Sequence, residues 1–352
     1  MSQPALDAEE HEVQHRPAVR AAVELVAAGA VLPAPLATAA MEELMDGVAP
    51  PTQVAALLGM LHVRGETPEE LAAFARVMRG RAVRVEAPHN AVDLCGTGAD
   101  GAGTFNISTL AAFVVAGAGV PVAKHGNRAI TSSCGSADLI EALGIPLDPG
   151  PDAVARRISE LGFGFIFAPA YHPAMKHAMP IRRELPMRTA FNLLGPISSP
   201  AGVRRQLLGV ADPALLPLMA GALARLETER ALVVHSVDGL DELSLGGPNL
   251  ALLVDDGEIS EISIDPEELG LRRADRATLA GGDAQLNSAI GVSVFGGEPG
   301  PARDVVLLNA GAALFVAGRA ADIAEGIEIA AQSIDSGAAA ERVTASATFA
   351  DA

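Results

Sequence analysis

Two loops rich in glycine, serine and threonine carry the residues of this sequence best suited to chemistry. The first spans residues 96–109 and the second spans residues 124–136. Each follows an apolar run typical of a strand and leads into a helical pattern. Free N–H groups at a helix start bind anions, and glycines let a phosphate approach the backbone. Because the second loop adds Lys124 and Arg128, we interpret the two loops as a site for a phosphorylated ligand.

A pair of neighbouring acids, Asp241 and Glu242, follows the strand-like run at residues 231–235. Carboxylates on a loop at a strand end suit Mg²⁺, which prefers oxygen ligands and substrate phosphates. A solvated turn is the alternative interpretation, and the pair alone does not decide between them. The phosphate site expected at the same sheet edge favours the metal. Mg²⁺ would also allow the acidic Asp100 to lie near a diphosphate.

Positive side chains gather in residues 171–184, which include His172, Lys176 and Arg182. Such a group can receive a substrate carboxylate, and arginine does so with two parallel hydrogen bonds. The alternative is a solvated helix face on which Arg182 or Arg183 pairs with a neighbouring glutamate. Without further context the solvated face is the better interpretation.

Two literal motif matches are interpreted as chance. Glycines at 96, 98 and 101 match the dinucleotide fingerprint, but residues 120–128 lack the acid that would hold a ribose. Residues 11–15 match the zinc-protease pattern HExxH, but they lie in a polar stretch without a helical apolar face. No Gly-Lys-Ser/Thr sequence follows the glycines, so a Walker A loop is excluded. Ordinary strand–helix turns are the remaining alternative for the two loops.

The hydrophobic pattern indicates the elements that must carry these loops. Residues 18–82 have apolar residues at helical spacing, and Thr67 before Pro68 marks a helix start. From residue 91 onwards strand-like runs alternate with helices, as in a parallel sheet covered by helices. We therefore predict an α/β fold class, with a small helical-bundle domain and a larger domain whose mostly parallel central sheet is flanked by helices.

The individual elements expected are strands at residues 91–95, 120–123, 163–167, 231–235 and 250–254, helices at 110–118, 137–143 and 310–331, and a hairpin turn at 255–257.

Composition and charge exclude several function classes. The chain has 352 residues, with 25 Lys and Arg against 43 Asp and Glu, a formal charge of −18. This charge argues against nucleic acid as a partner, and one Tyr without any Trp argues against base-stacking surfaces. Cys95 and Cys134 are too far apart for a CxxC motif, which favours a reducing, cytoplasmic setting. Residues 1–17 are interpreted as a polar tail, and no apolar run is long enough to predict a membrane span.

Taken together, these segments resemble the anthranilate phosphoribosyltransferase family. The resemblance rests on the two loops, the acid pair, and residues 64–70, 172–176, 188–196 and 307–309, in the family's order. It implies a helical, dimer-forming domain at 18–85 plus about 174–196. It also implies an α/β domain at 86–173 and 197–345 that binds phosphoribosyl diphosphate, and a homodimer.

The resemblance further implies a set of residues for each ligand. Those implied for phosphoribosyl diphosphate are Gly96, Ala99, Asp100, Thr104, Asn106, Ile107, Ser108, Thr109, Lys124, His125, Gly126, Asn127, Arg128, Ser132 and Ser136. Those implied for anthranilate are Gly96, Asn127, His172 and Arg182, and those implied for Mg²⁺ are Ser108, Asp241 and Glu242. It also implies that His125 and His172 lie near the acceptor, and it singles out no residue as a certain catalytic group.

The implied reaction transfers the 5-phosphoribosyl group to the amine of anthranilate, giving N-(5-phosphoribosyl)anthranilate and diphosphate, a step of tryptophan biosynthesis. We expect an oxocarbenium-like transition state. The aryl amine is already a neutral nucleophile at pH 7, so the reaction demands no strong base. Catalysis would come from alignment and from stabilisation of the leaving diphosphate by Mg²⁺ and cations. The sequence leaves open whether the acceptor is anthranilate or a substituted analogue.

Two alternatives from other classes remain for comparison. A pyrimidine nucleoside phosphorylase-like enzyme shares the architecture, but residues 124–128 differ from the corresponding motif of that family. A non-enzymatic, nucleic-acid-binding relative of the same fold would be basic and would lack the Asp241–Glu242 pair.

Overall fold

The structure is a computed structural model that describes residues 17–98, 100–129 and 133–350. The chain divides into two compact units. The first comprises Met1–Ala82 and His172–Leu194, and the second comprises Val83–Tyr171 and Gly195–Ala352. None of the described helices is long and apolar enough to cross a membrane.

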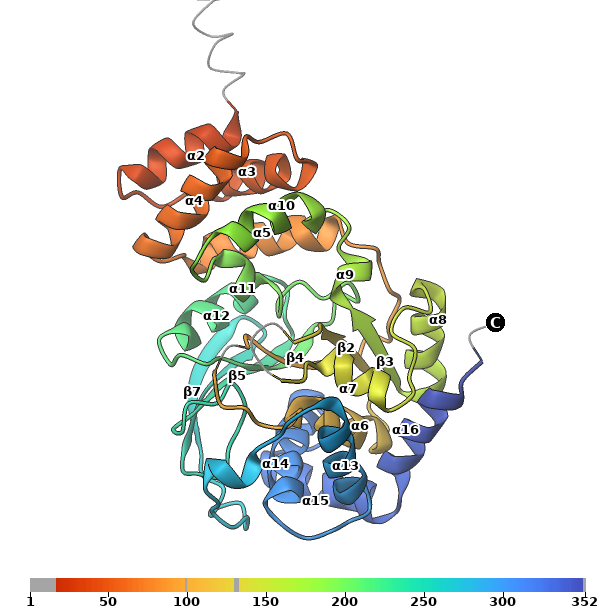
Figure 1. The fold of residues 1–352 in the computed structure, drawn as a ribbon. Coiled ribbons are helices and arrows are strands. Elements are labelled where there is room, and N and C mark those ends of the chain that lie inside the picture. The colour runs from red at the N-terminus through yellow and green to blue at the C-terminus, as the bar shows by residue number, and fades with distance from the viewer. Residues whose placement is uncertain (1–16, 99, 130–132, 351–352) are drawn as a thin grey trace, which may run out of the picture. The chain divides into compact units, whose positions relative to one another are not determined.

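The first unit is a bundle of helices, as the red, orange and green ribbons of Figure 1 show. Its helices are α2 (Ala18–Ala27), α3 (Ala34–Asp46), α4 (Pro51–Arg64), α5 (Pro68–Gly80), α10 (Met175–Glu184) and α11 (Ala190–Leu194). Apolar residues at helical spacing face inward, so that Leu58, Leu61, Leu71 and Phe74 are buried. The last two helices come from a later part of the chain, which returns to complete the bundle.

Prolines and carboxylates set the helix starts of this bundle. Helices α3, α4 and α5 each have a proline in the first turn, where its missing N–H costs no hydrogen bond. Thr67 caps α5 and forms a reciprocal capping box with Glu70, which confirms the predicted helix start. The start of α2 is capped from α3, because Glu43 accepts the N–H groups of Ala18 at 2.6 Å and Val19 at 2.9 Å.

The fully buried carboxylate of Glu70 ties several segments of the bundle together. It accepts the N–H of Leu32 at 2.8 Å and the N–H of Thr67 at 2.9 Å. It also pairs with the guanidinium of Arg64. A buried charge is costly unless it is paired and hydrogen-bonded, so these partners are what make Glu70 tolerable there.

The second unit is built on a seven-stranded sheet with the order β3-β2-β1-β4-β5-β6-β7. The strands are β1 (Val92–Gly96), β2 (Val122–Gly126), β3 (Phe163–Phe167), β4 (Arg205–Gly209), β5 (Arg230–Ser236), β6 (Asn249–Asp255) and β7 (Glu258–Ile264). The first five strands pair in parallel, and β6 pairs antiparallel with both β5 and β7, which confirms the predicted mostly parallel sheet. The predicted hairpin turn joins β6 to β7, with positive φ at Asp256 and Gly257.

Helices cover the sheet in layers (Figure 1). They are α6 (Ile107–Gly117), α7 (Ser136–Ala142), α8 (Pro151–Arg156), α9 (Ala168–Tyr171), α12 (Leu215–Ala224), α13 (Ala284–Phe295), α14 (Pro301–Val316), α15 (Ile323–Asp335) and α16 (Ala338–Thr348), with a π-helical turn at Arg157–Leu161 and a 3₁₀ turn at Arg276–Leu279. Side chains such as Val92 and Leu94 pack against α6 and α14 in the main core. On the other face, Ala123 and Ile166 pack with α8. Because α6 lies between the sheet and further helices, it is apolar on nearly all sides.

The order of the strands reverses at β1. Strands β2 and β3 continue outward on one side of β1, and β4 and β5 do so on the other. Connections that diverge in this way leave a crevice at the carboxyl ends of the strands, where open α/β sheets bind ligands. Gly96 and Gly209 end β1 and β4, and they are partners in the register between these strands.

One predicted helix is wrong as a single element. The expected helix at residues 310–331 is divided, because α14 ends at Val316 and α15 begins at Ile323. Gly318 adopts a left-handed φ of 73°, and Asp322 caps the new helix by accepting the N–H of Glu325 at 2.8 Å. The alanine-rich composition favours a helix throughout and therefore gives no sign of the break between α14 and α15. The prediction also omits β4, which starts on two polar residues, and the largely exposed edge strand β7.

We predict that Glu70→Ala destabilises the helical unit strongly. The change leaves the Arg64 charge and two backbone N–H groups without their partner, for which losses of about 3–5 kcal/mol are typical. Urea unfolding followed by circular dichroism measures the effect. The control is Arg20→Ala, which removes an exposed pair with Glu24 and should cost less than about 1 kcal/mol. Equal losses in both variants would contradict the role assigned to Glu70.

Candidate functional site

The acid pair lies against the ends of β1 and β4, at the crevice of the sheet. The Asp241 side chain approaches Gly96 so closely that a Cβ there would come 2.2 Å from Asp241 Oδ2. A Cβ on Gly209 would lie 1.6 Å from the backbone oxygen of Asp241. Glycine is therefore required at both strand ends, because any side chain would push the Asp241 loop away.

Hydrogen bonds connect the acid pair to the first loop and to α6. Asp241 Oδ2 accepts the N–H of Gly98 at 2.6 Å. Glu242 Oε1 accepts the N–H of Ser108 at 3.2 Å, in the first turn of α6, where the helix dipole favours a negative charge. The structure thus brings together the three residues predicted for Mg²⁺.

Lys124 supplies the positive charge beside this cluster. Its side chain extends from β2 toward α6 and is almost fully buried. The ammonium group donates to the carbonyl of Leu94 at 2.5 Å and to Ser108 Oγ at 3.2 Å. Since Ser108 also contacts Glu242, the lysine is held beside the acids from a neighbouring strand.

The electrostatics of the pair indicate an excess of negative charge. Burial, together with the charge of Asp100, raises the pKa of Asp241 to about 7. Burial and the charge of Asp241 raise the pKa of Glu242 to about 8, although Lys124 acts in the opposite direction. Both shifts mean that ionised carboxylates are unfavourable here without an additional cation.

The donor set fits a divalent metal ion of the Mg²⁺ kind. Two carboxylates and the Ser108 hydroxyl are hard oxygen ligands. No group of three His, Cys, Asp or Glu side chains arranged to hold a metal occurs among the residues that the structure describes. A metal held here would therefore take further ligands from water or from substrate oxygens, as Mg²⁺ commonly does.

The first loop is held in place from two sides. Residues next to Thr104 pair with a later segment, because the N–H of Phe105 donates to Leu279 and the N–H of Gly281 donates to Gly103. Asn106, at the start of α6, donates to the carbonyl of Cys134 at 3.0 Å in the second loop. Its Oδ1 accepts the amide of Asn287 on α13 at 2.9 Å. Asn106 therefore joins the two loops, and Ile107 and Thr109 are buried behind it.

The second loop is organised around Asp138 on α7. Its carboxylate accepts the N–H groups of Ala129 at 3.0 Å and Gly135 at 2.9 Å, and it pairs with Arg128 at 2.8 Å. Burial acts to raise the pKa of Asp138, but these hydrogen bonds hold it below its ordinary value. Arg128 also pairs with Glu141 at 3.0 Å, so this predicted phosphate cation is engaged by two carboxylates.

Asn127, Gly126 and Ser136 close the second loop near the end of β2. The backbone oxygen of Asn127 accepts the hydroxyl of Ser136 at 3.2 Å, and its Oδ1 accepts the N–H of Arg128 at 2.8 Å. A Cβ on Gly126 would lie 2.3 Å from Ser136 Oγ, so the close turn needs glycine. His125 is buried beside them, and its backbone N–H donates to the buried carboxylate of Asp93 at 3.2 Å.

Two predicted acceptor residues belong to the helical unit. Arg182 lies on α10 with its guanidinium 5.2 Å from the centre of the Phe191 ring. Burial lowers the pKa of Arg182, and no ion pair joins it to a carboxylate of the described residues. The alternative interpretation, in which Arg182 pairs with Glu184, is thus not found among the described residues. His172 is buried at the start of the returning segment.

Some predicted residues lie outside the described residues. They are Ala99, Ser132 and the HExxH match at residues 11–15.

Sequence reasoning misses several residues that organise the site. Asp138, Asn287 and Gly209 carry no motif of their own, and Asn287 and Gly209 meet the site through residues remote in sequence. An aspartate three residues after Gly135, at a helix start, is the one local signal that could have been used.

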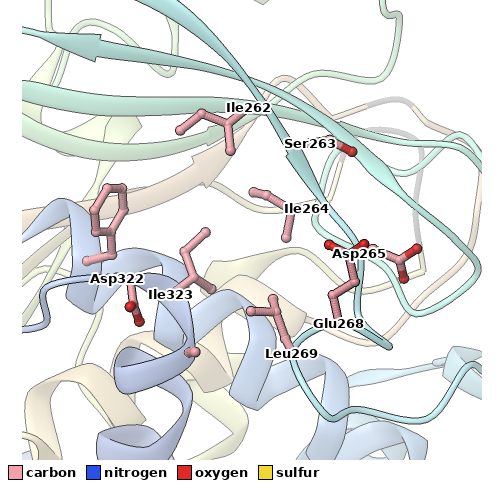
Figure 2. Close-up of a pocket in the computed structure, with 10 residues that line it drawn as sticks. Ile262, Ser263, Ile264, Asp265, Glu268, Leu269, Asp322 and Ile323 are labelled. Atoms are coloured by element: carbon pink, nitrogen blue, oxygen red, sulfur yellow. The ribbon is translucent and has the colours of Figure 1, made fainter.

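A separate hollow of about 350 Å³ lies where β7, the end of α14 and the start of α15 meet. Figure 2 shows Ile262, Ile264, Leu269 and Ile323 pointing into it, with the carboxylate of Asp265 at its edge. None of its lining residues is a predicted site residue.

Comparison with known proteins gives a consistent result along the chain. Residues 20–82 match the "Glycosyl transferase family, helical bundle domain", and residues 88–340 match the "Glycosyl transferase family, a/b domain". The chain is 52% identical over 318 residues to the anthranilate phosphoribosyltransferase of Rhodopseudomonas palustris (strain BisA53). That alignment covers 90% of this chain and 94% of the relative.

Solved structures give the same result. The anthranilate phosphoribosyltransferase of Thermus thermophilus matches with a TM-score of 0.89 and 45% identity, covering 95% of this chain and 99% of that one. The Saccharomyces cerevisiae enzyme in complex with PRPP (phosphoribosyl diphosphate) and Mg matches with a TM-score of 0.84 and 27% identity, covering 94% and 97%. The yeast enzyme in complex with 4-fluoroanthranilate matches with a TM-score of 0.83 and 26% identity, covering 93% and 96%.

We predict that the acid pair makes the metal-free protein less stable as pH rises. A carboxyl whose pKa is raised on folding favours the folded state while it is protonated, and this contribution is lost between about pH 4 and pH 8. At pH 8, Asp241→Asn with Glu242→Gln should therefore stabilise the EDTA-treated protein by about 1–3 kcal/mol. At pH 4.5 the difference in the free energy of unfolding between the variant and the wild type should be much smaller.

Urea unfolding at the two pH values makes this measurement. The control is Glu267→Gln with Glu268→Gln, which neutralises an adjacent acid pair on another loop of the same unit. The raised pKa values would be contradicted if the variant and the wild type differed in free energy of unfolding by the same amount at both pH values.

Proposed function

The chain belongs to the anthranilate phosphoribosyltransferase family, and from this premise we propose how its residues transfer the 5-phosphoribosyl group from phosphoribosyl diphosphate to anthranilate. The observation that carries the proposal is the acid pair held between Gly96 and Gly209, with Lys124 and two glycine-rich loops beside it. These are a metal-binding group and an anion-binding group at one sheet edge. A ligand with a metal-bound diphosphate requires both.

The first loop and the start of α6 are assigned to the diphosphate. The glycines of the loop would let its oxygens approach the backbone, with Thr104, Asn106 and Thr109 nearby. Lys124 would add a fixed positive charge on the side of β2. Because the cross-links of Asn106 hold both loops in advance, little reorganisation is needed when the diphosphate leaves.

Ser108, Asp241 and Glu242 are assigned to Mg²⁺. When bound, the ion would neutralise charge on the departing diphosphate. The raised pKa values of both acids support this assignment, since a cation removes the cost of their ionisation. Asp100, in the first loop, adds a further carboxylate whose charge needs the same compensation.

The acceptor is assigned to Asn127, His172 and Arg182, together with Gly96. Arg182 suits the carboxylate of anthranilate, because its guanidinium is not neutralised by a carboxylate of the described chain. Since the aryl amine attacks as a neutral group, the residues need only align it with the anomeric carbon and exclude water. The family resemblance also associates His125 and His172 with the acceptor, and the proposal gives neither a proton-transfer role.

We further propose a homodimer that forms through the helical unit and acts in the cytoplasm. Val31, Val48 and Val63 of this unit are large apolar residues with 50%, 71% and 85% of their surface exposed. They supply apolar surface for such a contact. Cys95 and Cys134 form no disulfide, which agrees with a reducing compartment.

The test of the function is the loss of anthranilate fluorescence on addition of phosphoribosyl diphosphate and Mg²⁺. We expect turnover by the wild type and a loss of at least about 100-fold for Asp241→Ala with Glu242→Ala, because metal and diphosphate stabilisation disappear together. Glu267→Ala with Glu268→Ala is the matched control and should retain wild-type rates. Absence of turnover by the wild type at every Mg²⁺ concentration would overturn the proposed function.

We predict that Arg182→Ala weakens acceptor binding specifically. Loss of charge-assisted hydrogen bonds worth about 1.5–3 kcal/mol should raise the KM for anthranilate by about 10- to 100-fold. The KM for phosphoribosyl diphosphate should stay the same. Arg183→Ala, the exposed neighbour on the same helix, serves as the control. An unchanged KM for anthranilate in Arg182→Ala would remove this residue from the acceptor site.

A further inference from the structure

Asn309 is a buried polar residue in an otherwise apolar stretch of helix. It lies on α14, where all the other residues from Val305 to Val316 have apolar side chains or are glycine. Its exposed surface is 0%. A carboxamide in such a place costs free energy unless each of its polar atoms is hydrogen-bonded. Its partners therefore indicate what the residue does.

The side chain of Asn309 forms a clamp on the backbone of Leu243. Oδ1 accepts the N–H of Leu243 at 3.1 Å, and Nδ2 donates to the carbonyl of Leu243 at 2.8 Å. The same Nδ2 also donates to Val305 at 2.9 Å within its own helix. Because the N–H and the C=O of one residue belong to successive peptide units, the clamp fixes both peptide planes around Leu243.

The clamped residue directly follows the acid pair. On the other side of the pair, Ser236 Oγ accepts the N–H of Leu240 at 2.8 Å and contacts its carbonyl at 3.3 Å. The next residue, Ser244, is held in the same manner by Asn249, with bonds of 2.9 Å and 3.1 Å. Asp241 and Glu242 are thus the two residues between fixed points at Leu240 and at Leu243.

We propose that Asn309 is a positioning residue that aims Asp241 and Glu242 for metal binding. The proposal rests on the function assigned above. With the backbone fixed on both sides, Glu242 reaches the N–H of Ser108 and Asp241 keeps its close approach to Gly209. The two carboxylates repel each other, so an unclamped segment would turn them apart toward solvent. The clamp opposes this movement and keeps the carboxylates of Asp241 and Glu242 on the same side of their chain segment.

The test compares Asn309→Leu with Leu308→Ala. Leucine keeps the bulk of Asn309 but offers no hydrogen bond to Leu243. Leu308 is equally buried one position earlier on the same helix, and its loss weakens the core without touching the clamp. For both variants we would measure thermal stability, the Mg²⁺ dependence of anthranilate turnover, and Mn²⁺ binding in the presence of diphosphate by electron paramagnetic resonance.

We expect Asn309→Leu to weaken Mn²⁺ binding and to raise the half-saturating Mg²⁺ concentration by about 10- to 100-fold, as is typical when a partner behind a metal ligand is lost. Part of kcat should return at saturating Mg²⁺. Leu308→Ala should lower thermal stability and leave both metal curves unchanged. Metal curves of Asn309→Leu that match the wild type, or equal shifts in Leu308→Ala, would overturn the proposal.

Asn309→Ser is the second variant in case the leucine variant does not fold. Its hydroxyl can keep one of the two bonds to Leu243, so the metal curves should lie between those of the wild type and of Asn309→Leu. If only this variant folds, curves identical to the wild type overturn the proposal. Mn²⁺ binding also separates the two claims, because it reports on the clamp even if the wild type transfers no phosphoribosyl group.

Discussion

The structure depends on keeping two adjacent carboxylates close to the backbone at the ends of two neighbouring strands. Asp241 and Glu242 repel each other, and burial raises the pKa of both. Only Gly96 and Gly209 leave enough space for the approach, and among the described side chains Lys124 supplies a fixed positive charge against Glu242. The protein thus maintains an electrostatically unfavourable arrangement that the proposed metal ion would relieve, a common relation between stability and function.

Polar side chains around the acid pair hold the neighbouring loops in place through hydrogen bonds that do not involve the two acids. Asn106 joins the two loops, Asp138 organises the second loop, and Asn309 holds the backbone behind the acid pair. Each of these side chains binds backbone groups of a segment other than its own helix. Such bonds rigidify loops that would otherwise be free to move, and a rigid set of donors is what stabilises a leaving diphosphate.

The helical unit is held together by different interactions. Its helix starts are fixed by prolines and by Glu43 and Glu70, whose carboxylates accept N–H groups of other segments. The returning segment of the chain brings Arg182 and His172 into this unit, whereas the residues assigned to diphosphate and metal belong to the α/β unit. The residues proposed for the acceptor therefore come from both units, since Gly96 and Asn127 belong to the α/β unit and His172 and Arg182 to the helical unit.

The sequence by itself determined the fold class, the two glycine-rich loops and the acid pair, because periodicity, glycine content and adjacent charges are local properties. It also carried the family resemblance. Only the tertiary structure decided that Gly209 must be glycine and that Asn309 clamps Leu243, since their partners lie 32 and 66 residues away. The division of the helix at residues 310–331 was likewise hidden, because alanine favours a helix on both sides of Gly318. Contacts between remote segments leave no periodic signal, and they are what place these groups together.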